Sequence, residues 1–145
     1  MGIKRMKKCM IGIIVGAAVI VSGIRGFYYL QNERDMEIYN SHSMSFSNYQ
    51  EEWITVVVNK LHIEDQQSCA EEIVEKCRMN NFKNIQFSYD LAIPNELRVS
   101  VYLSERDVKR HNEAFSFSYT QDELNGEYNI VEHPEKFKLQ IDKDS

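Results

Sequence analysis

Residues 97–119 read LRVSVYLSERDVKRHNEAFSFSY, and this stretch decides the fold class. Apolar residues occupy every second position on both sides of a charged segment: Leu97, Val99, Val101 and Leu103 before it, and Phe115, Phe117 and Tyr119 after it. Alternation with a period of two is typical of strands that bury one face. The stretch therefore predicts two strands, joined by the charged turn 104–112 and paired antiparallel as sequence neighbours.

Other segments extend this pattern in both directions. Ile85, Phe87 and Tyr89 alternate in the same way, and residues 93–96 offer a turn towards the strand at Leu97. Asn125-Gly126 is a hairpin signal, because both residue types tolerate positive φ, and it leads into residues 127–130. Residues 137–141 predict a last strand, and residues 44–46 a weak early one. Together these segments predict an antiparallel sheet of about four or five strands.

The clearest helix is predicted over residues 65–82. One apolar stripe recurs at helical spacing, and it consists of Cys69, Ala70, Ile73, Val74 and Cys77. Ser68 and Glu71 form a capping-box pattern, while Asp65 offers an earlier cap. Asn80-Asn81 is a plausible stop.

Residues 47–63 carry two conflicting signals. The β-branched run at residues 54–58 favours a strand. Apolar residues at helical spacing and a capping-box pattern at residues 47–50 favour a helix, and we take the helix as the better interpretation. The predicted fold is therefore α+β, with two helices packed on one face of the antiparallel sheet.

The N-terminus predicts a membrane anchor. Residues 1–8 form a basic tip, and residues 9–30 are apolar apart from Arg25, which is close enough to the end of the segment to reach the headgroups. About 20 helical residues cross a hydrocarbon core, so residues 9–30 are long enough for one span. Basic residues ahead of the span predict a single-pass protein of the cell membrane with its N-terminus inside and its C-terminal domain outside. The alternative is a cleaved signal peptide, which also exports the rest of the chain.

Charge divides the chain in the same place. The 145 residues carry a net charge of −5, but residues 1–30 hold five basic side chains and no acid. The remainder therefore carries −10, and a body this acidic is a poor binder of nucleic acid, whose affinity comes mainly from neutralised phosphates. We expect residues 31–40 to form a polar stalk and residues 41–145 to form the extracytoplasmic domain.

Few residues suggest chemistry. Cys69 and Cys77 lie on the apolar stripe about 12 Å apart along a helix, so we expect buried thiols without a mutual disulfide. His62 stands near Glu64 and Asp65, where a metal or an acid–base site would need partners from elsewhere. Serine-nucleophile, zinc and phosphate-loop motifs are absent from the sequence, so we assign no catalytic, cofactor-binding or metal-ligating residue.

This layout resembles that of small membrane-anchored proteins of bacteria, and it implies no residue role. We expect a non-enzymatic module, anchored in the membrane by residues 9–30, that binds another envelope protein. Its partner surface would be the sheet face that the helices leave open, marked by Tyr102 and by Ser88, Ser100, Ser116 and Ser118. The alternatives are an exported hydrolase or metal-dependent enzyme with a site at His62, Glu64 and Asp65, and a structural subunit that packs through the span at Gly12 and Gly16.

Overall fold

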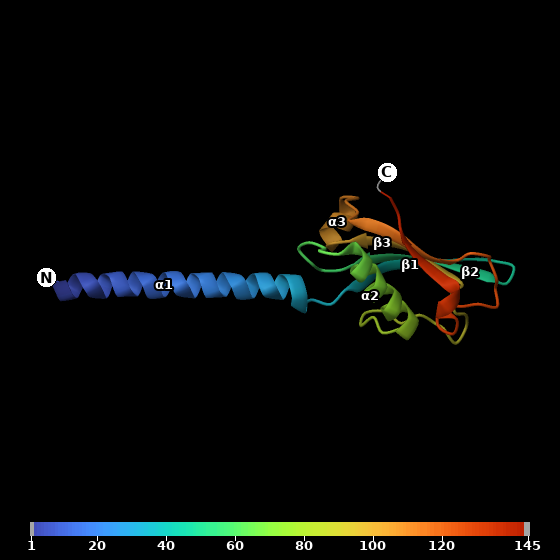
Figure 1. Ribbon diagram of the computed structural model, residues 1–145, viewed down its shortest axis with the longest axis horizontal. Helices are drawn as coiled ribbons and strands as arrows, with labels where there is room; N and C mark the ends of the chain where they lie inside the picture. The colour runs from blue at the N-terminus through green and yellow to red at the C-terminus, as the bar shows by residue number, and fades with distance from the viewer. Residues whose placement is uncertain (1, 144–145) are drawn as a thin grey trace. The chain divides into compact units, whose positions relative to one another are not determined.

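The computed structural model describes residues 2–143 of the chain, with side chains from residue 5 onward, and divides into two compact units, Met1–Arg34 and Asp35–Ser145. The first unit is one long helix, α1 (Gly2–Tyr28), which continues into a π-helical turn, η1 (Tyr29–Glu33) (Figure 1). The stretch Arg5–Glu33 is long and apolar enough to cross a membrane, and its large apolar side chains are exposed. The helix predicted over residues 9–30 is therefore present, and its length suits a span.

The second unit is built on a five-stranded sheet with the order β1-β2-β3-β4-β5. The strands are β1 (Glu37–Phe46), β2 (Tyr49–Val57), β3 (Glu96–Tyr102), β4 (Phe115–Gln121) and β5 (Phe137–Ile141). The helices are α2 (Gln66–Met79), α3 (Glu105–Lys109) and the 3-10 turn η2 (Pro134–Lys136). The α+β class is confirmed, as are the strands predicted at residues 97–103, 115–119 and 137–141.

The helix predicted over residues 47–63 is wrong, because β2 occupies this region. Both faces of β2 carry apolar side chains: Ile54 and Val56 on one, Tyr49, Trp53 and Val57 on the other. Apolar residues on two faces hide the period of two and imitate a helical stripe. One of the two predicted helices is therefore a strand.

The all-antiparallel pairing is also wrong at one place. β2 and β3 are parallel, from Glu51 opposite Glu96 to Val57 opposite Tyr102, whereas the other neighbouring pairs are antiparallel. The chain between these strands contains α2, and parallel neighbours need such a crossover. The sheet is mixed because the chain returns, before β3, to the end of the sheet at which β2 begins.

Residues 85–89 do not form the predicted strand. The partly buried side chains of Ile85, Phe87 and Tyr89 do pack against the core, so their alternation has a cause. The backbone of Phe87, however, bonds to the side chain of Asn80: its N–H donates to Oδ1 and its carbonyl accepts from Nδ2, both at 2.8 Å. An asparagine amide thus takes the place of a neighbouring strand.

The hairpin predicted at Asn125-Gly126 is likewise wrong, since residues 127–130 form turns and not a strand. Gly126 is needed for a different reason. A Cβ at this position would overlap the backbone oxygen of Asn48, so the turn after β4 packs directly on the turn between β1 and β2.

The predicted stalk, residues 31–40, includes the start of the sheet. β1 begins at Glu37, and Met36 and Ile38 belong to the hydrophobic core. Residues 37–40 are therefore part of the folded domain, and the weak strand expected at residues 44–46 is the end of a ten-residue strand.

Helix α2 carries the predicted apolar stripe into the core. All five stripe residues are buried, in one cluster with inward-facing residues of the sheet such as Val56, Val101 and Phe117. Asp65 is the N-cap, accepting from the N–H groups of Gln67 and Ser68, so the earlier of the two predicted starts applies. The short helix α3 has no buried residue, so α2 alone supplies a buried helical stripe among the described residues of this unit.

Candidate functional site

The residues of the enzyme alternative lie at an exposed turn. His62 Nε2 is 3.5 Å from Glu64 Oε1, with about half of the first side chain and 80% of the second exposed. Asp65 caps α2, and the Ser68 hydroxyl lowers the pKa of its carboxyl by hydrogen bonding. Within residues 2–143, no three histidine, cysteine or acidic side chains gather as a metal site would require.

The two helix thiols are buried and unbonded, as predicted. Burial raises the pKa of Cys69 to about 11 and, with a smaller contribution from the Glu52 charge, that of Cys77 to about 12. Nucleophilic thiols need the opposite shift, because the thiolate is the reactive form. These cysteines are therefore core residues.

Alternation along the strands gives the sheet two different faces. We call the face that carries Val56, Val101 and Phe117 the inner face, and the opposite one the outer face. Ser100, Ser116 and Ser118 lie half-buried on the outer face, as does Tyr102, whereas Ser88 lies off the sheet. Four of the five residues that were expected to mark an open face therefore lie on the same face of the sheet.

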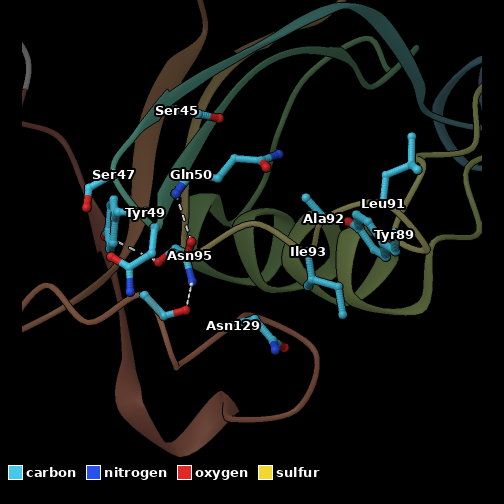
Figure 2. Close-up of a pocket in the computed structure, with 12 residues that line it drawn as sticks. Ser45, Ser47, Tyr49, Gln50, Tyr89, Leu91, Ala92, Ile93, Asn95 and Asn129 are labelled. Atoms are coloured by element: carbon cyan, nitrogen blue, oxygen red, sulfur yellow. Dashed lines mark hydrogen bonds between the residues drawn. The ribbon is translucent and has the colours of Figure 1, made fainter.

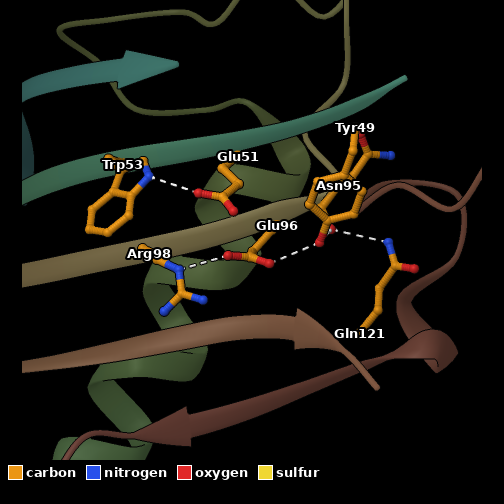
Figure 3. Close-up of polar contacts among 7 residues, drawn as sticks. All are labelled: Tyr49, Glu51, Trp53, Asn95, Glu96, Arg98 and Gln121. Atoms are coloured by element: carbon orange, nitrogen blue, oxygen red, sulfur yellow. Dashed lines mark hydrogen bonds and ion pairs between the residues drawn. The ribbon is translucent and has the colours of Figure 1, made fainter. Parts of the chain in front are cut away.

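An aromatic and charged cluster occupies the outer face of β1, β2 and β3, and we call it the Trp53 cluster: His42, Tyr49, Trp53, Glu96 and Arg98. Figure 3 shows the four members that lie on β2 and β3. The His42 ring stacks on Trp53 with centroids 5.9 Å apart, and the Arg98 guanidinium lies 5.6 Å from the Trp53 ring centroid. Trp53 keeps 38% of its surface exposed. Trp53 thus lies between the His42 ring and the Arg98 guanidinium, and its exposed ring is a preformed apolar surface with polar edges.

The Glu96 carboxylate holds two members of this cluster, Arg98 and Tyr49, in place. Its side chain is only 3% exposed, and its two oxygens accept from Arg98 Nε at 2.7 Å and from the Tyr49 hydroxyl at 2.8 Å. Burial, followed by the hydrogen bond to Glu96, raises the pKa of Tyr49, so the phenol remains a donor. The buried carboxylate thus has its counter-charge, and it holds the guanidinium in one place.

Two buried amides hold the adjoining end of the sheet together. Asn95 accepts from the Gln50 N–H at 2.8 Å and donates to the Tyr128 carbonyl at 2.6 Å. Gln121 donates to the Asn95 carbonyl at 3.1 Å and accepts from the Asn125 N–H at 3.1 Å. These contacts join the starts of β2 and β3 to the turn after β4 and so hold this end of the sheet together.

A groove lies on the inner face at the β1 side of the sheet. It consists of two adjoining cavities of about 480 and 400 Å³, which share Gln50, Tyr89, Leu91 and Ala92. Its floor is polar because Ser41, Ser43 and Ser45 of β1 face inward here. Figure 2 shows the cavity that Ser45 lines. Its facing wall is the segment 85–95, whose first five residues, 85–89, were predicted as a strand.

Glu52 lies on the floor of this groove and is 5% exposed. Its Oε2 accepts from the Ser43 hydroxyl at 2.5 Å and from Gln50 Nε2 at 3.5 Å. Glu52 is not among the residues predicted from the sequence, because a helix over residues 47–63 would place it in an exposed first turn. Once β2 is a strand, Glu52 shares the face of Ile54 and Val56, and this parity alone places it inside.

The Trp53 cluster on the outer face and the groove beside Glu52 both combine exposed residues with side chains held by hydrogen bonds. No residue role comes to either from a relative. Comparison with known proteins matches the chain to no family model, no curated protein and no solved structure.

Proposed function

We propose that the protein is a non-enzymatic interaction module, anchored in the cell membrane by α1, which binds another protein of a bacterial envelope through the outer face of its sheet. The Trp53 cluster carries this proposal. Interface hot spots are enriched in tryptophan, tyrosine and arginine, and contact residues that are held in place before binding lose less entropy. Trp53 and Arg98 are exposed and held in place here, and the buried Tyr49 hydroxyl donates to the Glu96 carboxylate that holds Arg98.

Exposed apolar residues next to the cluster support the same surface. Met44 and Phe46 of β1 lie on the outer face, opposite Glu51 and Tyr49, and about half of each is exposed. Together with Trp53 they form an apolar strip beside a guanidinium. A strip of this kind suits a partner that presents an apolar side chain next to a carboxylate.

The topology we propose places the N-terminal tip in the cytoplasm and residues 31–145 outside, with α1 retained as a signal anchor. Basic residues before α1 support this direction. We expect an impermeant maleimide to label Glu123→Cys in intact cells and Arg5→Cys only after permeabilisation, in a Cys9→Ser background. Labelling of Arg5→Cys alone in intact cells would reverse the topology, and loss of residues 1–30 from the mature protein would replace the anchor with a cleaved signal.

Site-specific photocrosslinking in the native membrane tests the partner surface. A benzophenone amino acid at Met44 should capture one discrete partner, and Trp53→Ala should abolish that product. The same probe at Met79, an exposed methionine of α2, is the matched control and should give no such product. Equal products from both positions, or products that survive Trp53→Ala, would refute the outer face as the binding surface.

A further inference from the structure

We propose that the groove beside β1 binds an extended peptide segment and that a lysine or arginine side chain of this peptide pairs with Glu52. This site lies on the inner face, whereas the proposed function uses the outer face; Tyr49, a member of the Trp53 cluster, also lines one of the two cavities. Glu52 supplies the first reason. It is the only charged residue among the described residues that line the two cavities.

Glu52 also lacks the counter-charge that the other buried glutamate of the sheet has. Glu96 pairs with Arg98 at 2.7 Å, whereas Glu52 takes part in none of the ion pairs among the described residues. Its partners are the neutral donors of Ser43 and Gln50. A carboxylate removed from water is costly without a cation, so an entering ammonium or guanidinium group gains a partner that is already oriented.

Aromatic side chains in the same cavity favour a cation further. Phe87 and Tyr89 line it together with Glu52, and their rings stack with centroids 5.6 Å apart. The Tyr89 hydroxyl donates to the Cys77 carbonyl at 2.6 Å, which fixes its ring. Ring faces attract ammonium and guanidinium groups, and a carboxylate beside them adds charge pairing.

The length of the groove and the edge of the sheet favour a peptide over a small amine. Ser41 lines one cavity and Ser45 lines the other, and because four residues of a strand span about 13 Å, the groove is at least that long. β1 is an edge strand, and near its start the Asn84 side chain donates to the Ile38 carbonyl at 2.9 Å and accepts from its N–H at 3.3 Å. Asn84 thus makes the contacts of a neighbouring strand at one residue, and an extended peptide can continue them along β1.

The test uses the full chain in dodecyl maltoside micelles and two capped, fluorescein-labelled peptides, Thr-Val-Thr-Lys-Thr-Val-Thr and its analogue with norleucine in place of lysine. We expect fluorescence polarisation to show that the lysine peptide binds about tenfold or more tightly than the analogue. Glu52→Gln should remove that difference. Glu51→Gln makes the same charge change on the outer face and should leave both affinities within about twofold.

A second variant keeps the test decisive if Glu52→Gln fails to fold. Ala92 is exposed and lines both cavities, so Ala92→Trp should fill the groove and abolish binding of the lysine peptide without disturbing the core. Equal affinity for the two peptides, no binding of either, or binding that survives Ala92→Trp would overturn the proposal. Crosslinking from Met44 should persist in Ala92→Trp, so failure at the groove is distinguishable from failure at the outer face.

Discussion

Replacing Ile73 by alanine tests the link between the stripe of α2 and the core. Ile73 has no exposed surface and belongs to the cluster that α2 shares with the sheet. The change removes three buried carbon atoms, which at about 0.8 kcal/mol each gives about 2.4 kcal/mol of lost burial. The cavity left behind brings the expected destabilisation to about 2–5 kcal/mol.

The control is Glu72→Ala, one residue away on the exposed side of the helix. This change places the best helix former at a solvated position, so the free energy of unfolding should move by no more than about 0.5 kcal/mol. A domain of this size has about 5–15 kcal/mol of stability, so the contrast between the two variants is large.

Trp53 provides the assay. It is the only tryptophan of the chain and lies on β2, so its fluorescence reports unfolding of the sheet while α1 contributes nothing. In a urea titration of the full chain in micelles, Ile73→Ala should lower the midpoint by about 1–2.5 M, given a slope of about 2 kcal/mol per molar. Equal midpoints for the two variants would refute the packing of α2 on the sheet. A fragment starting at residue 41 would be unsuitable, because it would truncate β1.

Three further outcomes are expected. Cys69 and Cys77 should resist maleimide at pH 8 in the folded protein, and rapid labelling under native conditions would contradict their burial. Because burial raises their pKa values above the ordinary 9.0, their contribution to the free energy of unfolding should be intact below pH 9 and disappear between about pH 9 and 12. Gly126→Ala should cost about 1–3 kcal/mol in the same urea titration, because its Cβ meets a backbone oxygen, and an unchanged midpoint would show that the turn relaxes freely. Lys83 lowers the pKa of Asp35, so Lys83→Met should raise that pKa in an NMR titration; the pair's stabilisation is present at neutral pH and is lost as the pH falls through the lowered pKa.

The parts of the fold that the sequence predicted correctly are those in which one pattern has one cause. Val99 and Phe117 alternate because their strands have one apolar face, and Ile73 follows a helical stripe because α2 has one buried side. The failures occur where a pattern has a second cause. Trp53 adds an apolar residue to the outer face of β2, and Phe87 alternates in a segment whose backbone bonds to a side chain.

The two candidate surfaces could not be predicted from the sequence, because both lie on segments that were predicted wrongly. A helix over residues 47–63 would place Trp53 on its apolar side and Glu52 in its solvated first turn. Neither the stacking of His42 on Trp53 nor the contact of Arg98 is local in sequence, so no short-range pattern could have revealed the cluster. The strand register brings these residues together, and it follows from pairing across the whole sheet.

The way the chain enters the sheet has a mechanical consequence. If α1 is anchored and a partner holds the sheet, as proposed, tension between them passes through residues 35–38 into β1, which pairs with β2 alone among the described strands. Three side chains clasp this entry: Lys83 pairs with the Asp35 carboxylate at 2.6 Å, Asn59 donates to the Asp35 carbonyl at 2.8 Å, and Asn84 bonds to both backbone groups of Ile38. Their attachment points lie on the segments that flank α2. Tension on residues 35–38 is therefore shared between β1 and the loops at both ends of α2, which protects β1 from separating from β2 first.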